Sequence, residues 1–253
     1  MKKVLLFLIT VLVFLPWNSL ADGNESLFEQ ANALYTEGKY KEAILSYEQI
    51  LQTGQESAQV HYNLGNAYFK TNQLNLAILN YERGSLLSPG DEDIQYNLSI
   101  ANELITDRIE ALPEFFFITW FKSLKVILPA NSWALMSILS FGIAGIFAIL
   151  FIALRKRGWR KISLISAIAG VLISAFSLLF AFQQGKQLSN RNTCIVFAPT
   201  VTIKSSPDDS GTNLFVLHEG VKLIIIDQLS EWYEIKLADG NLGWIPIEAV
   251  EII

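Results

Sequence analysis

The sequence predicts a multidomain membrane protein with an all-α N-terminal part, a hairpin of two transmembrane helices and a small all-β C-terminal part. Three observations predict this arrangement. A 34-residue period runs through residues 24–91, two segments near the middle are apolar and uncharged, and short runs of alternating apolar and polar residues follow from about residue 192. These patterns are typical of helical repeats, membrane spans and strands.

Charge and hydropathy divide the chain in the same way. Of its 253 residues, 51% are hydrophobic, and the mean hydropathy is +0.35. Residues 22–114 hold 15 acidic and 5 basic side chains, residues 192–253 hold 9 and 3, and no acidic residue lies between Phe115 and Pro207. Two acidic parts therefore flank an apolar, basic middle. This argues against nucleic acid as a partner, because a basic face is needed to displace phosphate counterions.

The N-terminus has the layout of a secretory signal peptide. Two lysines follow Met1, residues 4–17 carry no charge, and Ser19-Leu20-Ala21 supplies small residues for cleavage before Asp22. This order of a basic, an apolar and a small-residue region predicts a signal peptide at residues 1–21. The alternative is an uncleaved anchor, which the shortness of the apolar run disfavours. Either interpretation sends the segment that follows to the outside.

Two apolar segments predict a transmembrane hairpin. Residues 133–154 and 162–182 contain no charged residue, and each is long enough to cross the hydrocarbon layer, which takes about 20 residues. The loop between them, residues 155–161, holds five cations in seven residues. Because positive loops stay on the cytoplasmic side, we expect this loop in the cytoplasm. The sequence thus predicts a bacterial inner-membrane protein with its N-terminal and C-terminal domains in the periplasm.

An aromatic segment precedes the first span. Residues 113–130 contain a cluster of aromatic side chains together with Lys122 and Lys125. This composition predicts a linker helix that lies in the headgroup zone, where amphipathic rings are favoured. The alternative is a linker helix buried in protein.

The 34-residue period matches a known helical repeat. Ala43 and Tyr47 recur as Ala77 and Tyr81, and the run Tyr62-Asn63-Leu64 recurs as Tyr96-Asn97-Leu98. Residues 61–91 resemble a tetratricopeptide (TPR) unit at its defining positions, which are Leu64, Gly65, Tyr68, Ala77, Tyr81 and Pro89. We therefore expect residues 22–112 to form a TPR domain of two repeats and a capping helix. The expected helices are 25–37, 40–53, 58–71, 74–87 and 92–110.

The resemblance to TPR domains implies a concave, protein-binding groove lined by the first helix of each unit. Carried over by position, its lining residues are Phe28, Asn32, Tyr35, Tyr62, Asn66, Phe69, Tyr96 and Ile100. Some TPR domains clamp a peptide carboxylate with lysines, but three of those positions hold Phe28, Tyr62 and Tyr96 here. An aromatic, amide-bearing groove suits a mixed apolar and polar segment of a protein instead. The alternative is that these aromatic rings only pack among themselves.

The C-terminal residues 192–253 are similar to bacterial SH3-like domains. The resemblance rests on the stretches VTIKSSP, LHEGVKLIII and EWYEIKLADGNLGWIPIEAVEII, with Ser206 where the family carries a glycine. It implies a small all-β barrel whose aromatic ligand face would contain Trp232, Tyr233 and Trp244. The alternative is that these aromatic residues serve packing alone.

No pattern for catalysis or for a cofactor or metal is found in the sequence. Cys194 is the only cysteine, and the two histidines, His61 and His218, lie in different domains. A reactive thiol needs an electropositive setting, and we expect Cys194 to be unreactive and half-buried. The sequence therefore predicts a protein that is not an enzyme and carries no cofactor.

The order of domains resembles the aerotolerance-operon (Bat) E-type proteins of Bacteroidetes, which combine a signal peptide, TPR units, two spans and a terminal SH3-like domain. The resemblance implies a protein-interaction scaffold in a cell-envelope complex linked to aerotolerance and other stress tolerance. It implies other membrane proteins as partners, including proteins with von Willebrand A domains. The alternative function is a cell-wall or ligand sensor that uses the SH3-like domain, which a seven-residue cytoplasmic loop disfavours.

Overall fold

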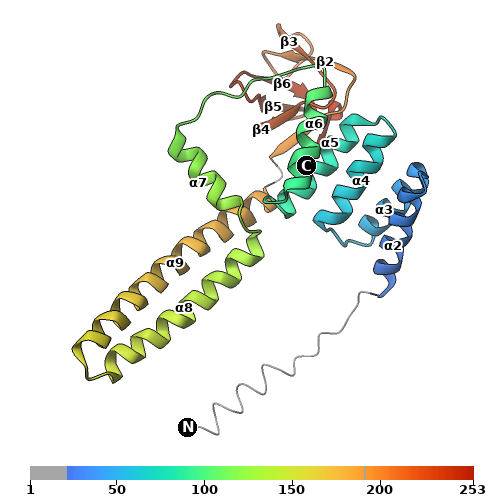
Figure 1. Ribbon diagram of the computed structural model, residues 1–253. Coiled ribbons are helices and arrows are strands. Elements are labelled where there is room, and N and C mark those ends of the chain that lie inside the picture. Colours follow the sequence, from blue (N-terminus) through green and yellow to red (C-terminus); the bar gives the residue numbers. More distant parts are fainter. Residues whose placement is uncertain (1–21, 191) are drawn as a thin grey trace.

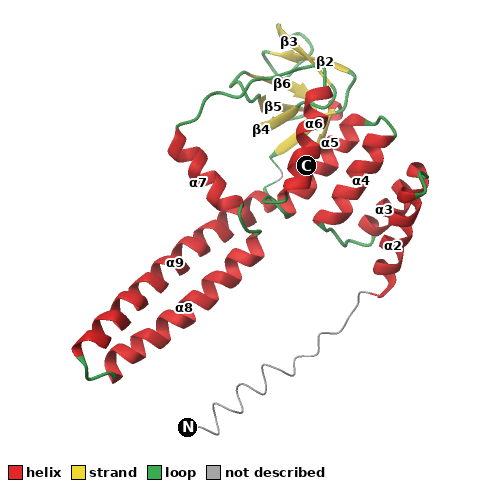
Figure 2. Ribbon diagram, viewed as in Figure 1, coloured by secondary structure: helices red, strands yellow, loops and turns green. Residues whose placement is uncertain are grey.

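The computed structural model describes residues 22–190 and 192–253, so the predicted signal peptide lies outside the described residues. Figure 1 shows three parts: a helical array, a long hairpin of two helices with a short helix beside it, and a sheet. Among the described residues, strands occur only in the C-terminal part, as Figure 2 shows. An all-α array, two apolar helices and an antiparallel sheet are thus confirmed in the predicted order.

Five helices form the N-terminal array: α2 (Asp22–Thr36), α3 (Tyr40–Gln52), α4 (Ala58–Lys70), α5 (Leu74–Leu87) and α6 (Glu92–Leu104). The starts of α4 and α6 follow local chemistry. The Ser57 hydroxyl accepts a 3.1 Å hydrogen bond from the Val60 amide at the start of α4, and the Asp91 carboxylate accepts from the Ile94 amide in α6. Both are N-caps, which satisfy amides that have no partner inside the helix. Tight turns follow α2, α3 and α4, each with a positive φ residue: Gly38, Gly54 or Asn72.

Small residues let neighbouring helices of the array approach closely. Ala43 and Ala77 are completely buried, and Gly65 lies so near Tyr81 that an added Cβ would be 2.7 Å from its ring. Tyr47 and Tyr81 are also buried and fill the space between helices. The equivalent positions of the 34-residue period therefore have equivalent packing roles.

The capping helix α6 is shorter than predicted. It ends at Leu104, whereas the sequence suggested residue 110. The next residues leave the helix and contact the sheet: Ile105 and Ile109 pack against its core, and Asp107 accepts a 2.6 Å hydrogen bond from the His218 amide. These tertiary contacts outweigh the helical preference of residues 105–110.

Three helices make up the middle of the chain: α7 (Phe116–Val126), α8 (Ala130–Ala153) and α9 (Arg157–Ser189). The predicted loop 155–161 is largely helical, because α9 begins at Arg157, and α9 also extends past residue 182. Arginine and lysine are good helix formers, so the basic residues continue the helix instead of interrupting it. Both α8 and α9 are long and apolar enough to cross a membrane.

The two long helices contact each other along a narrow seam of small residues. An added Cβ on Gly170 would lie 2.9 Å from the Ala144 Cβ, and the Ser137 hydroxyl donates a 3.0 Å hydrogen bond to the Ser174 carbonyl oxygen. Small residues and hydroxyl groups of this kind are typical of helix contacts in membranes. Away from the seam the helices expose large apolar side chains, such as Ile152 at 80%.

Seven strands form one antiparallel sheet in the order β3-β2-β6-β5-β4-β1-β7. The strands are β1 (Thr193–Val196), β2 (Thr200–Lys204), β3 (Asn213–His218), β4 (Lys222–Leu229), β5 (Trp232–Lys236), β6 (Leu242–Pro246) and β7 (Val250–Ile252), with a 3₁₀ turn η1 (Ile247–Ala249) before the last. Alternate side chains enter a shared core, where Ile203, Leu223, Ile235 and Ile245 are completely buried.

The sheet is docked onto the helical array. Ile195 of β1 is buried within the apolar core of the array, and Phe197 and Ile253 pack against that core. Gly220, with φ at +93°, permits a turn so near the array that an added Cβ would lie 2.6 Å from Ile105 Cγ2. The two terminal parts of the chain therefore form one packed unit through α5 and the segment after α6.

Candidate functional site

A pocket of about 270 Å³ opens on the helical array. It is lined by Tyr35, Tyr62, Asn66, Phe69, Lys70, Tyr81, Asn97 and Ile100. Five of the eight residues predicted for the groove are therefore brought together here. They come from α2, α4 and α6, the first helices of the repeats and the cap, as the helical period requires.

Three predicted groove residues lie outside this pocket. Phe28 packs on Tyr47, with ring centroids 6.1 Å apart, and Asn32 takes part in a hydrogen-bond network one repeat earlier. Tyr96 is 66% exposed. Position within the repeat does not show how far the pocket extends along these helices.

An amide network runs through the pocket. Asn66 Oδ1 accepts a 2.7 Å hydrogen bond from the Tyr81 hydroxyl and a 2.8 Å hydrogen bond from Asn97 Nδ2. These contacts fix the orientation of both amides. Among the described residues, they engage the acceptor of Asn66 and a donor of Asn97. The groups left for a ligand are therefore the Asn66 Nδ2 donor and the Asn97 Oδ1 acceptor.

The same network occurs 34 residues earlier in the chain. Asn32 Oδ1 accepts hydrogen bonds from the Tyr47 hydroxyl at 2.6 Å and from Asn63 Nδ2 at 2.9 Å. Burial raises the pKa of Tyr47 to about 12 and also raises that of Tyr81, so both hydroxyls stay protonated and act as donors. The network belongs to the repeat itself, and only its second copy lines the pocket.

Three lining residues were not predicted from the sequence: Lys70, Tyr81 and Asn97. Two of them had a signal, because Tyr81 repeats Tyr47 and Asn97 repeats Asn63 at the 34-residue spacing. That spacing identified structurally equivalent positions, but it did not show that their polar atoms meet beside Asn66. Lys70 follows Phe69 at the end of α4 and had no repeat signal.

The aromatic face predicted for the sheet is divided by the strand geometry. Trp232 and Trp244 lie on one face of neighbouring strands β5 and β6, since Trp232 pairs with Pro246 and Trp244 with Glu234. Tyr233 points to the opposite face and is part of the buried core. Because side chains alternate along a strand, Tyr233 cannot share a ligand face with the two tryptophans.

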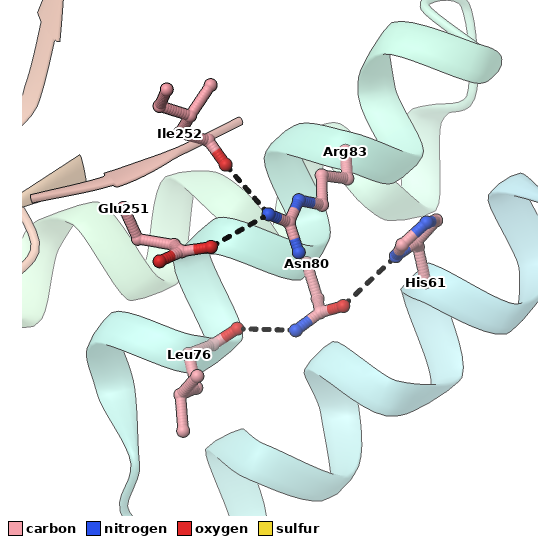
Figure 3. Close-up of polar contacts among 6 residues, drawn as sticks. All are labelled: His61, Leu76, Asn80, Arg83, Glu251 and Ile252. Carbon is pink, nitrogen blue, oxygen red and sulfur yellow. Dashed lines mark hydrogen bonds and ion pairs between the residues drawn. The ribbon is translucent and has the colours of Figure 1, made fainter. Parts of the chain in front are cut away.

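The residues considered for chemistry are held by structural contacts. Cys194 is completely buried in the core of the sheet, and not half-buried as expected; burial raises its pKa to about 12. His218 contacts Asp107 through Nδ1 at 3.0 Å. His61 is buried, and its Nδ1 lies 3.0 Å from Asn80 Oδ1 (Figure 3). No group of three or more histidine, cysteine, aspartate or glutamate residues that could hold a metal is found in residues 22–190 and 192–253.

Comparisons with known proteins agree with the helical repeats. A family described as TPR repeat matches residues 31–72, and a family described as tetratricopeptide repeat matches residues 58–91. The N-terminal array therefore contains TPR repeats, which points to a protein-binding role. The comparison with curated proteins found no match.

Among solved structures, a match is found with the type III secretion translocator chaperone SycD of Yersinia enterocolitica. It shares 16% sequence identity, the match covers 69% of this chain and 89% of SycD, and the TM-score is 0.32.

Proposed function

We propose that this chain is a membrane-anchored scaffold whose TPR pocket binds an extended segment of a partner protein. The observation that carries the proposal is the paired amides of Asn66 and Asn97. One offers a donor and the other an acceptor, side by side. One residue of an extended chain presents its own C=O and N–H on the same edge, as the complementary acceptor and donor. The amide pair can therefore bind a backbone whatever its side chains.

The rings around the amides supply the apolar part of the binding. Tyr62 lies beside Tyr81, with centroids 6.3 Å apart, and Phe69 lines the same pocket. Aromatic anchors in a concave site typically dominate protein binding. Lys70 adds a cation at the pocket wall. The favoured ligand is therefore an extended segment that combines an apolar side chain with polar or acidic neighbours.

We place this scaffold in the bacterial inner membrane, with α8 and α9 as the two spans and both terminal domains in the periplasm. The length and hydropathy of the two helices and the five cations of residues 155–161 support this topology. The resemblance to Bat E-type proteins supports an envelope complex that serves aerotolerance, with von Willebrand A domain proteins among the partners.

A second function, a cell-wall or ligand sensor, is favoured by one observation. Trp232 and Trp244 lie half-buried on one face of the sheet, in the stretch whose sequence is similar to bacterial SH3-like domains. A pair of outward tryptophans can stack on a ligand. The sensor would bind purified sacculi through these two residues and lose that binding in Trp244→Ala, whereas the scaffold requires no such binding.

The scaffold is tested by partner recovery after crosslinking in native membranes, with Asn97→Ala compared against Asn63→Ala. Each change removes the amide-to-amide hydrogen bond of the repeated network. Asn97→Ala also removes a 3.3 Å hydrogen bond to the Tyr62 hydroxyl. Of these two asparagines, Asn97 lines the pocket and Asn63 does not. We expect Asn97→Ala, alone or with Tyr62→Ala, to abolish recovery of the partner, and Asn63→Ala to retain it. Equal recovery by the folded variants would contradict the pocket as the binding site.

A further inference from the structure

The three parts of the chain meet around a second cavity, of about 550 Å³. We call it the junction cavity. Side chains from α5, α6, α7, α9 and β4 line it, including Lys122, Lys125, Lys222, Gln184 and Gln187. Gly90, in the turn before α6, approaches α7 so closely that an added Cβ would lie 2.5 Å from the Val126 carbonyl oxygen. The cavity is thus enclosed by elements from all three parts.

An apolar cavity of about 630 Å³ adjoins it along α7. Phe117, Trp120 and Phe121 line this α7 cavity, and Gln183 of α9 completes its wall. Lys122 and Lys125 line both cavities, so they form the boundary between them. A polar, cationic compartment and an apolar compartment therefore lie side by side and share two lysines.

The junction cavity has an excess of positive charge. Its lining contains three lysines and a single carboxylate, that of Glu82, which accepts a 2.6 Å hydrogen bond from Lys222 Nζ. Lys122 pairs with Glu114, outside the lining, at 2.5 Å. Lys125 Nζ contacts only the side-chain oxygen of Gln187, at 3.4 Å, among the described residues. Lys125 is thus a cation beside a cavity with no carboxylate neighbour.

Several contacts fix α7 at the ends of the two long helices. The ring of Phe180 in α9 packs against Phe121 at 5.1 Å and Trp133 at 5.0 Å. Gln184 Nε2 donates hydrogen bonds to the carbonyl oxygens of Lys125 and Leu128. Figure 1 shows α7 beside the end of the hairpin that is nearer to the array and the sheet. If α8 and α9 cross the membrane as proposed above, both cavities lie at its periplasmic surface.

We propose that the two cavities together bind one phospholipid with an anionic headgroup. The proposal rests on the membrane position given under the proposed function. The headgroup phosphate would lie in the junction cavity against Lys122 and Lys125, where the amide of Gln187 can bind headgroup hydroxyls. One acyl chain would lie along Phe117 and Trp120 in the α7 cavity. A small soluble anion would use the lysines alone and would leave the apolar compartment without an occupant.

The structure gives such a lipid a defined role. It would bridge α7, the end of α9 and the α5–α6 turn, and so fix the angle of the packed periplasmic unit relative to the membrane. Cations at the membrane surface each favour anionic lipid, and the effect falls off within about 10 Å. The two boundary lysines should therefore account for most of the headgroup preference.

The test uses the full chain, purified in dodecyl maltoside and freed of lipid. Binding of dioleoyl-phosphatidylglycerol and of dioleoyl-phosphatidylcholine is measured by native mass spectrometry. We expect one phosphatidylglycerol molecule to bind in preference to phosphatidylcholine. Lys122→Gln with Lys125→Gln should weaken phosphatidylglycerol binding about tenfold to thirtyfold. Lys122 is exposed and Lys125 is half-buried at the cavity wall, and neither belongs to an apolar core, so the variant should fold.

The matched control is Lys156→Gln with Lys161→Gln, which removes two cations at the other end of the hairpin and should keep the wild-type preference. Trp120→Ala should weaken binding of the long-chain lipid. Glycerol 3-phosphate, which has the headgroup chemistry without acyl chains, should not compete. Wild-type affinity in the Lys122 and Lys125 variant, or equal binding of glycerol 3-phosphate, would overturn the proposal.

Failure of the lipid site can be separated from failure of the membrane position. Carbonate extraction of cell membranes releases a peripheral chain and leaves an inserted one. A chain that carbonate releases contradicts the membrane position and with it the lipid site. A chain that resists carbonate but shows no preference for phosphatidylglycerol contradicts the lipid site alone.

Discussion

The guanidinium group of Arg83, in the TPR helix α5, donates a 2.7 Å hydrogen bond to the main-chain oxygen of Ile252 in the last strand (Figure 3). Glu251 lies 3.4 Å from the same nitrogen, and Lys222 contacts Glu82 one residue before Arg83. The end of the chain is therefore held by the second helix of a repeat. This leaves the first helices, which line the pocket, uncovered by the sheet.

We expect Arg83→Ala to loosen this contact. The loss of one charged donor to a carbonyl oxygen should lower the free energy of unfolding by about 1 kcal/mol. The exposed Glu251 contact should add little. Hydrogen exchange measured on the full chain in detergent should become faster in Val250–Ile252. Arg108→Ala is the control, because within residues 22–190 and 192–253 Arg108 donates to the nearby Glu103 carbonyl oxygen and contacts no part of the sheet through a hydrogen bond. Unchanged exchange in β7 would show that apolar contacts alone hold the sheet.

Gly65→Ala should destabilise the array. The added methyl group would lie 2.7 Å from two ring carbons of Tyr81, which is itself buried and hydrogen bonded to Asn66. Overpacking of this kind costs about 1–3 kcal/mol, and Gly65→Leu should unfold the array. The matched control is Gly185→Ala in α9, where an added Cβ meets no atom within 4 Å. Thermal unfolding, followed by circular dichroism, should give a lower melting temperature for Gly65→Ala than for Gly185→Ala. Equal melting temperatures would contradict the close packing.

The helix starts could be predicted from sequence because they depend on neighbours in the chain. Ser57 and Asp91 are caps three residues before the amides they bind, and the turn at Gly38 needs only its own positive φ. The end of α6 could not be predicted, since Asp107 binds His218, 111 residues later. The docking of the sheet is non-local in the same way. Arg83 and Ile252 are 169 residues apart.

The predicted binding residues also divide into those that local periodicity places and those that depend on distant pairing. Helical periodicity places one group on a single face of the array, where they share a pocket: Tyr35, Tyr62, Asn66, Phe69 and Ile100. For the strands, a list of aromatic residues was insufficient, because the alternation along β5 sends Tyr233 into the core and Trp232 outward. Strand register had to be known before a face could be assigned.

His61 should make the stability of the array depend on pH. Burial lowers its pKa from the ordinary value of 6.5. The Asn80 hydrogen bond opposes burial with a smaller effect, and the charge of Arg83 lowers the pKa by less still. The unfolded chain then takes up the proton first as the pH falls. The free energy of unfolding is therefore greatest above pH 6.5 and decreases as the pH falls below it, by at most about 1.4 kcal/mol per pH unit.

The measurement is urea unfolding of the full chain in detergent between pH 7.5 and pH 5.5. His61→Gln should show a smaller pH dependence than the wild-type chain over this range. His218→Gln is the comparison variant, because the chain has only these two histidines. If His61→Gln retains the full wild-type slope, another group accounts for the dependence.

The proposed topology can be tested with cysteines introduced at exposed positions. The native thiol should give no background labelling. Cys194 is completely buried and its pKa is raised to about 12, so a folded chain should not react with a maleimide. Ser210→Cys places a thiol on an exposed loop of the sheet, and Gly158→Cys places one near the basic loop, where an added Cβ meets no atom within 4 Å. In cells with a permeabilised outer membrane and an intact inner membrane, a membrane-impermeant maleimide should label Ser210→Cys only. Gly158→Cys should require lysis of the inner membrane.

The reverse pattern would show that the five-cation loop faces the periplasm, and labelling of both without lysis would show that α8 and α9 do not cross the membrane.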